Sequence, residues 1–255
     1  MTVAHLSQLT WPEAKAMGEA GAWVLMPMGS TEAHGPHLPL STDTILSEEV
    51  VARSAVRLSE ELGIPVVIAP TMPYGVTDFA APFAGTISLS EETLVQFIQE
   101  WGCSLADHGL GRICLINNHL EPGQLKALIE GTRKLNEDPR ISAIFANNCS
   151  KRWARTLTDE FKSGACHAGQ YETSLVLASQ PDTVKTDVAA GLAANDTSLS
   201  WAIREGATNF VEAGGPDAYF GFPADGTAAE GEDTYSLLVE MVVTEIRECR
   251  EAGGD

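Results

Sequence analysis

The stretch WVLMPMGSTEAHGPHLPLSTD, residues 23–43, decides how this chain folds. Its first six residues form an apolar run, which is typical of a strand that is buried on both faces in a parallel sheet. The remainder, framed by Gly and Pro, carries two carboxylates and two imidazoles, and Asp43 stands where a helix should begin. In α/β enzymes, polar loops at the ends of core strands carry the chemistry. We therefore expect a functional loop at the edge of a parallel sheet.

Apolar runs alternate with amphipathic stretches along the rest of the chain. We expect further strands at residues 65–70, 113–117 and 141–146, and helices at residues 44–62, 90–109, 121–135 and 232–251. Strands separated by helices of this length imply right-handed crossovers and a mainly parallel β-sheet with helices on both faces. No internal repeat or linker interrupts the pattern. The sequence therefore predicts a single α/β domain over residues 1–255.

Composition excludes several classes of function. The 35 acidic and 16 basic residues give a net charge of -19, which would repel a nucleic acid. No apolar run approaches the roughly 20 residues that span a bilayer, and residues 1–12 lack the apolar core of a signal peptide. The five cysteines contain no CxxC pair, which argues against a disulfide framework or a four-cysteine zinc site. We expect a cytoplasmic protein that binds neither nucleic acid nor membrane.

Two further segments supply ligand-type side chains. His119 and Glu121 follow the third expected strand, with the same i, i+2 spacing as Glu32 and His34. His167 lies near the start of a later helix. Because the carboxyl ends of parallel strands meet at one edge of a sheet, we expect the two loops to converge there.

The metal-ligand candidates share carboxylate or imidazole chemistry, without a thiolate; they are Glu32, His34, Asp43, His119 and Glu121. Such ligands suit Zn²⁺, Mn²⁺ or Fe²⁺. A single catalytic zinc takes three protein ligands, so five favour two ions that share a bridging carboxylate. A hydroxide formed between two divalent ions could attack an amide carbonyl. His167 would then hold the substrate or carry a proton to the leaving nitrogen.

Structural roles compete with these functional ones. An isolated Glu-x-His pair is weak evidence for a metal site, and Asn117 and Asn118 can hold their loop through side-chain hydrogen bonds. Glu172, in the helix after His167, could orient a ligand from outside the metal site. The residues expected to contact substrate or to support the ligands are His37, Cys166, Glu172 and Tyr74.

These motifs together resemble the creatininase family of metal-dependent amidohydrolases. The similar segments are GSTEAHGPHLP at residues 29–39, NNHLE at residues 117–121, and HAG at residues 167–169 followed by Glu172. The resemblance runs from about residue 9 to the last expected helix. It implies a single α/β domain, a homohexamer, and two divalent metal ions per subunit, with Zn²⁺ the expected ion and Mn²⁺ or Fe²⁺ as alternatives.

The resemblance also implies how the ligands are divided. One ion would be held by Glu32, Asp43 and His119, and the other by His34, Asp43 and Glu121. His167 would be the catalytic histidine, and Glu121 is expected to take part in catalysis as well as in metal binding.

Departures from the family pattern bear on the substrate. Members that act on creatinine have Glu in place of Cys166 and Trp in place of Ser163. We therefore expect a different small substrate, cyclic or linear, cleaved at an amide C–N bond. The alternatives are a metallopeptidase that trims a modified peptide, a formamide deformylase, and a non-catalytic relative that binds a metabolite. A closed pocket lined by Phe79, Phe83 and Trp153 would favour the small amide, whereas open loops would favour the peptide.

Overall fold

Five strands form one sheet in the computed structural model, which describes residues 3–253. The strands are β1 (Val3–His5), β2 (Trp23–Met28), β3 (Val66–Ile68), β4 (Arg112–Asn117) and β5 (Ser142–Ala146). Their order is β1-β3-β2-β4-β5, and every neighbouring pair is parallel. The predicted α/β fold with a parallel sheet is confirmed.

The helices of the described chain vary widely in length. They are α1 (Trp11–Glu19), α2 (Thr42–Leu62), α3 (Glu91–Ala106), α4 (Pro122–Leu135), α5 (Lys151–Ala154), α6 (Asp159–Ser163), α7 (Gln170–Ser179), α8 (Thr186–Ala189), α9 (Leu199–Arg204) and α10 (Ala228–Gly253), with 3-10 turns η1 (Leu6–Gln8), η2 (Pro181–Thr183) and η3 (Pro223–Asp225). The four helices predicted with bounds are α2, α3, α4 and α10, and their ends differ from the prediction by at most four residues. None of the helices within residues 3–253 is both long and apolar enough to cross a bilayer.

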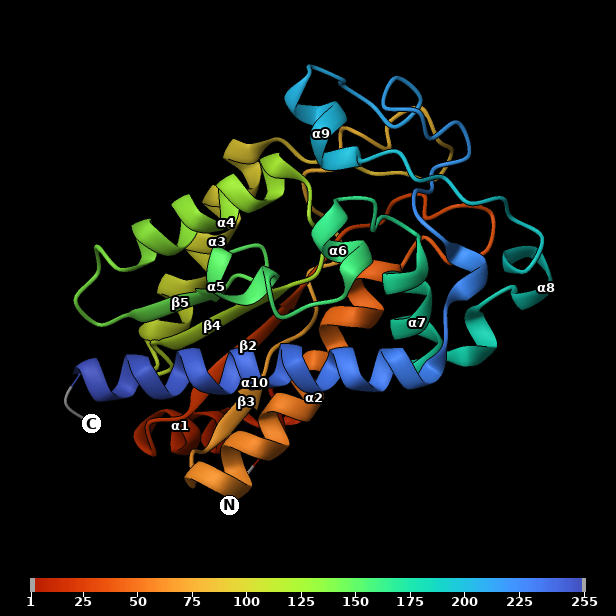
Figure 1. Cartoon of the computed structure of the whole chain (residues 1–255). Coiled ribbons are helices and arrows are strands. Elements are labelled where there is room, and N and C mark those ends of the chain that lie inside the picture. The colour runs from red at the N-terminus through yellow and green to blue at the C-terminus, as the bar shows by residue number, and fades with distance from the viewer. Residues whose placement is uncertain (1–2, 254–255) are drawn as a thin grey trace.

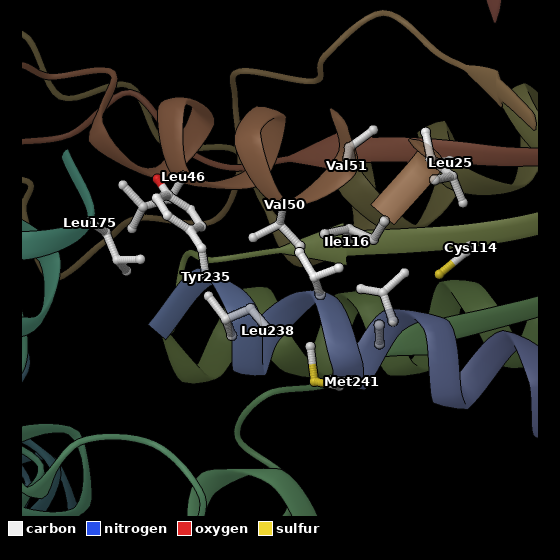
Figure 2. Close-up of a cluster of buried hydrophobic side chains, with 14 of the residues drawn as sticks. Leu25, Leu46, Val50, Val51, Cys114, Ile116, Leu175, Tyr235, Leu238 and Met241 are labelled. Atoms are coloured by element: carbon white, nitrogen blue, oxygen red, sulfur yellow. The ribbon is translucent and has the colours of Figure 1, made fainter. Parts of the chain in front are cut away.

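Side chains of alternate residues in the central strands pack into two separate hydrophobic cores, one on each face of the sheet. Leu25 and Ile116 point to the face covered by α2, α7 and α10, whereas Met26 and Leu115 point to the face covered by α1, α3 and α4. Figure 2 shows the first core, where side chains of α2, α10 and the strands meet. Burial on both faces explains why the strand sequences are continuously apolar.

The strand order places a crevice beyond β2 and β4. These strands are neighbours, but the chain leaves β2 toward β3 on one side and returns to β4 on the other. Loops that leave such a switch point diverge, and ligands of open α/β sheets bind there. Gly29, at the end of β2, allows the loop to approach the start of α2, because a Cβ at this position would lie 2.8 Å from the backbone nitrogen of Thr44.

Long loops cover this edge of the sheet with a third apolar cluster. Its buried members are Ala33, Ala80, Ala165, Phe210, Ala213, Ala218 and Phe220. Figure 1 shows these loops and α9 on the side of the sheet away from the two termini. The cluster closes over the ligand-rich loops and so sets the shape of the space above them.

Candidate metal centre and active site

Four segments of the chain bring buried ligand-type side chains together. Glu32 and His34 lie on the loop after β2, Asp43 in the first turn of α2, His119 after β4, and Glu172 in the first turn of α7. Each is at most 3% exposed. The predicted convergence of the first two loops is therefore present, and α7 joins them.

Two ligand groups share Asp43. His119 Nδ1 lies 3.1 Å from Glu32 Oε1 and 3.2 Å from Asp43 Oδ2. On the other side, His34 Nε2 lies 3.3 Å from Asp43 Oδ1 and 3.5 Å from Glu172 Oε2. The candidate ligand atoms of each group lie within 4.8 Å of one another, as do those of a third group formed by Glu32, His34 and His167.

The histidines are oriented by the backbone. In each of them one ring nitrogen lies against a carbonyl oxygen: His34 Nδ1 at 3.3 Å from Glu32, His119 Nε2 at 2.6 Å from Val76, and His167 Nε2 at 3.0 Å from Ala33. If these nitrogens carry the proton and donate it to the carbonyl, the opposite nitrogen is left as a base. Metal-ligating histidines are typically held in this way.

The buried carboxylates of the two groups are neutralised by protons on the imidazoles in the metal-free protein. Burial would lower the pKa of His34, but the carboxylates of Asp43 and Glu172 raise it to about 10. Burial would raise the pKa of Asp43, but the imidazoles of His34 and His119 hold it well below its usual range. Protons on the imidazoles thus balance the buried carboxylates, and divalent ions would displace them on binding.

Two buried atoms with poorly formed hydrogen bonds support the fit to metal ions. His34 Nε2 and Asp43 Oδ2 make no hydrogen bond of good geometry, although Asp43 Oδ1 lies 3.3 Å from the first and His119 Nδ1 lies 3.2 Å from the second. Buried polar atoms are normally hydrogen-bonded, so such atoms in a cluster of ligand-type groups are what an ion would satisfy. The mixed oxygen and imidazole donors suit Zn²⁺ or Mn²⁺.

Glu121 lies at the edge of these groups. Its Oε1 accepts a hydrogen bond from the Asp78 N–H at 2.8 Å and its Oε2 one from the Phe79 N–H at 3.2 Å. Burial raises its pKa to about 7. None of the three ligand groups among the described residues contains Glu121, and the group around His34 and Asp43 contains Glu172.

Glu172 is held by the turn that precedes its helix. The Ala168 N–H donates to Glu172 Oε2 at 2.6 Å. Ala168 has a φ of +50°, in the left-handed region that residues with a side chain rarely adopt. Burial raises the pKa of Glu172 to about 8. A tight turn therefore places His167 and Glu172 on the same side of the centre.

His167 is packed as a neutral base. Its ring centroid lies 4.2 Å from that of Phe210 and 4.4 Å from that of His34. Burial, together with the positive His34, lowers its pKa to about 4. Its Nδ1 lies 3.9 Å from Glu32 Oε1, so this nitrogen faces the centre.

A narrow pocket of about 60 Å³ leads to the centre. Glu32, Asp43, His119, Glu121, His167 and Glu172 contribute its polar wall, and Phe79, Leu199, Ile203 and Phe210 its apolar wall. No Lys or Arg of the described chain lines it. The pocket therefore offers an apolar surface opposite a concentrated polar centre.

Only some of the remaining predicted site residues line the pocket. Cys166 lines the pocket. His37 does not line it: its Nε2 lies 2.9 Å from Thr173 Oγ1, which joins the first loop to α7. Tyr74 is 40% exposed and is not among the pocket residues. Of the three aromatic residues expected in a closed pocket, Phe79 lines it, whereas Phe83 and Trp153 do not, and Trp153 donates to Glu245 Oε1 at 2.6 Å.

Several supporting residues were missed from the sequence. The Thr77 hydroxyl donates to Glu32 Oε2. The Gln124 carboxamide accepts from the Val76 N–H at 3.0 Å and donates to Asn117 Oδ1 at 3.1 Å, which ties the segment holding His119 to α4. No local pattern marks Thr77, but a Gln three residues after the ligand motif at residues 117–121 is a usable sequence signal for Gln124.

Comparison with known proteins gives a consistent result. The family model for creatininase, described as creatinine amidohydrolase, matches residues 7–246. A mycofactocin precursor peptide peptidase of Mycobacterium ulcerans (strain Agy99) is 34% identical over 241 residues, covering 93% of this chain and 85% of that protein. A creatinine amidohydrolase of Pseudomonas putida is 30% identical over 200 residues, 71% of this chain and 74% of its own. The solved structure "Creatininase Mn" aligns with a TM-score of 0.74 at 24% identity, covering 96% of this chain and 97% of its own.

Proposed function

The chain belongs to the creatininase family, and from that premise we propose that it holds two divalent metal ions and hydrolyses an amide C–N bond. The observation that carries this proposal is the pair of buried ligand groups that share Asp43. His34 Nε2 and Asp43 Oδ2, which are buried without a hydrogen bond of good geometry, support it.

We assign one ion to Glu32, Asp43 and His119, and the other to His34, Asp43 and Glu172. The second set differs from the sequence expectation, which had Glu121 where we now place Glu172. The reason is geometric, because Glu172 Oε2 lies 3.5 Å from His34 Nε2, whereas Glu121 belongs to none of the ligand groups among the described residues. When bound, the ions would polarise the scissile carbonyl and lower the pKa of a water molecule.

The protein's own groups would handle the protons. We assign His167 Nδ1 as a base that accepts a proton, because His167 Nε2 is held at the Ala33 carbonyl and Nδ1 faces the centre. Glu121 lines the same pocket and its pKa of about 7 allows it to hold a proton and release it to a leaving nitrogen. Phe79 and Phe210 would exclude water and contact the apolar part of the substrate.

Two substrate classes remain, each favoured by one observation. The narrow pocket of about 60 Å³ favours a small amide. The similarity to mycobacterial proteins named as precursor peptide peptidases, 32–34% identical over 88–93% of this chain, favours trimming of a peptide. In both cases the bond cleaved is an amide.

Metal analysis followed by a substrate panel tests the proposal. We expect the purified protein to bind two divalent ions per chain and to lose activity after chelation, with recovery on addition of Mn²⁺ or Zn²⁺. The panel contains creatinine, other small cyclic and linear amides, N-formyl compounds and short peptides. Cleavage of peptides alone would select the peptidase class. A protein that binds no divalent ion, or that is equally active after chelation, contradicts the proposal.

A further inference from the structure

Glu160, in α6, is a buried carboxylate outside the ligand groups. It is 8% exposed, and its oxygens accept three backbone hydrogen bonds: from Gln170 at 2.9 Å, Tyr171 at 2.7 Å and Phe222 at 2.7 Å. Charged acceptors make stronger hydrogen bonds than neutral ones. Glu160 therefore fastens two chain segments to α6.

One of these segments is the start of α7. The N-cap position of α7 is Gly169, which has no side chain to accept from the first free N–H groups of the helix. Glu160 accepts from the first two helical residues, Gln170 and Tyr171, and places a negative charge at the positive end of the helix. It caps α7 from a neighbouring helix.

The chain around the start of α7 also carries two residues of the proposed site, His167 and Glu172. Glu172 is the next residue of α7 after Tyr171, and His167 lies just before Gly169. The second fastened segment also reaches His167, because the Phe220 N–H, two residues before Phe222, donates to the His167 carbonyl at 2.8 Å. Both segments that border His167 are thus held by one carboxylate.

Two glycines make room for Glu160. A Cβ on Gly169 would lie 2.6 Å from Glu160 Oε1, and a Cβ on Gly221 would clash with the same oxygen. Gly221 also has a φ of +81°, a conformation that glycine adopts readily. The backbone at Gly169 and Gly221 therefore packs so closely against the Glu160 carboxylate that a side chain at either position would collide with it.

We propose that Glu160 is a positioning residue, which sets the Glu172 carboxylate and the His167 imidazole in the active site by fixing the start of α7. The inference rests on the proposed two-metal function. Replacing residues that support metal ligands typically costs 10–100-fold in metal affinity or activity.

The test compares Glu160→Gln with Thr158→Ala. The amide replaces one acceptor oxygen by an NH₂ group that faces backbone donors, so at least one of the three bonds is lost. Thr158→Ala removes the N-cap of the same helix, where the Phe161 N–H donates to Thr158 Oγ1 at 3.3 Å, and leaves the Glu160 bonds in place. It is a matched control for simple loss of stability.

Calorimetric titration of the metal-free variants with Mn²⁺ or Zn²⁺ gives the first readout, and kcat and KM give the second. For Glu160→Gln we expect one of the two ions to bind about 10–100-fold more weakly and kcat to fall by a similar factor. The other ion and KM should change little. Thr158→Ala should keep the wild-type metal affinities and kcat, even if its melting temperature falls as much as that of Glu160→Gln.

The other possible results contradict either the inference about Glu160 or the proposed two-metal function. If Glu160→Gln binds both ions with wild-type affinity, the inference is overturned. It is also overturned if metal affinity and kcat fall in both variants in proportion to their loss of melting temperature. If wild-type protein binds no ions, the proposed function itself fails. If Glu160→Gln does not fold, Glu160→Asp, which keeps the charge and shortens the reach, is measured instead; wild-type values for it also overturn the inference.

Discussion

At the scale of single residues, Asp43 is the side chain that joins two ligand groups of the proposed site. It is buried in the first turn of α2, and its two oxygens face different histidines. The positive end of a helix favours a carboxylate in its first turn. One residue thereby serves both ligand groups.

Replacing Asp43 by Ala should therefore remove both ions, because each group loses a ligand and the shared charge. Elemental analysis of the purified variant measures the ions per chain. Asp187→Ala, which removes an exposed acid from the first turn of α8, is the control and should keep two ions. Full metal content in the Asp43 variant would refute its bridging role.

Two conservative variants separate the roles of the neighbouring glutamates. Glu172→Gln should lower the metal content from two ions to one, whereas Glu121→Gln should keep both ions and reduce kcat by about 10²–10⁴-fold, the usual size of a lost proton-transfer group. Metal content and kcat are measured on the same preparations. The reverse pattern would return Glu121 to the ligand set.

His167→Ala tests whether that histidine is a base or a ligand, because His167 also lies in the third possible ligand group. As a base it should be dispensable for metal binding and required for turnover, with kcat reduced by about 10²–10⁴-fold. Metal analysis and steady-state kinetics give the answer. Loss of an ion in this variant would make His167 a ligand, and unchanged kcat would remove it from catalysis.

At the scale of elements, the site depends on how α7 packs against α10. Gly231 of α10 lies directly on the backbone of α7, where a Cβ would clash with the Ser174 carbonyl. The contact lets the two helices approach closely. A change in α10 can therefore move the helix that carries Glu172.

Gly231→Ala should destabilise the protein by about 1–3 kcal/mol, the usual cost of overpacking a core. Gly253→Ala is the matched control in the same helix, since nothing lies within 4 Å of its added Cβ. Chemical denaturation of the two variants measures the difference. Equal stabilities would show that α7 and α10 can separate without cost.

The long elements could be predicted from the sequence, but several short ones could not. α2 and α10 show sustained apolar periodicity, so their positions follow from the chain itself. α6 spans only Asp159–Ser163, and β1 only Val3–His5, which are too short to show a period. They are fixed by tertiary contacts, such as the parallel pairing of β1 with β3.

The same limit applies to the site. The motif residues Glu32, His34 and His119 follow predictable strands, so their convergence could be expected. The position of Glu172 beside His34 could not be predicted from the sequence, which offers two acidic residues near motif histidines, Glu121 and Glu172. Which of them reaches His34 depends on where α7 docks.

At the scale of the whole molecule, the buried charges link stability to pH. In the metal-free protein His34, Glu172 and Glu121 have pKa values raised to about 10, 8 and 7. The folded state therefore holds protons that the unfolded chain has already released above about pH 6.5. His37 and His167, with pKa values of about 4, titrate below this range. Stability that depends on the raised groups is lost as the pH rises through their folded pKa values.

We accordingly expect the melting temperature of the metal-free protein to fall between about pH 6.5 and 9, since the unfolded state binds fewer protons there. Saturating Mn²⁺ or Zn²⁺ should reduce or reverse this trend, because the ions replace the protons. Thermal unfolding in chelator and in metal, at matched pH values, measures both. A metal-free protein whose melting temperature is flat across this range would contradict the charge balance described for the centre.

The homohexamer and the cytoplasmic location stay predictions.

If two ions bind as proposed, the order of their ligands along the chain sets the order in which the two sites can form. A ribosome releases Glu32, Asp43 and His119 well before α7 has been synthesised, whereas the set around His34 waits for Glu172. A nascent polypeptide that folds as it emerges could thus capture its first ion during translation, but its second only afterwards.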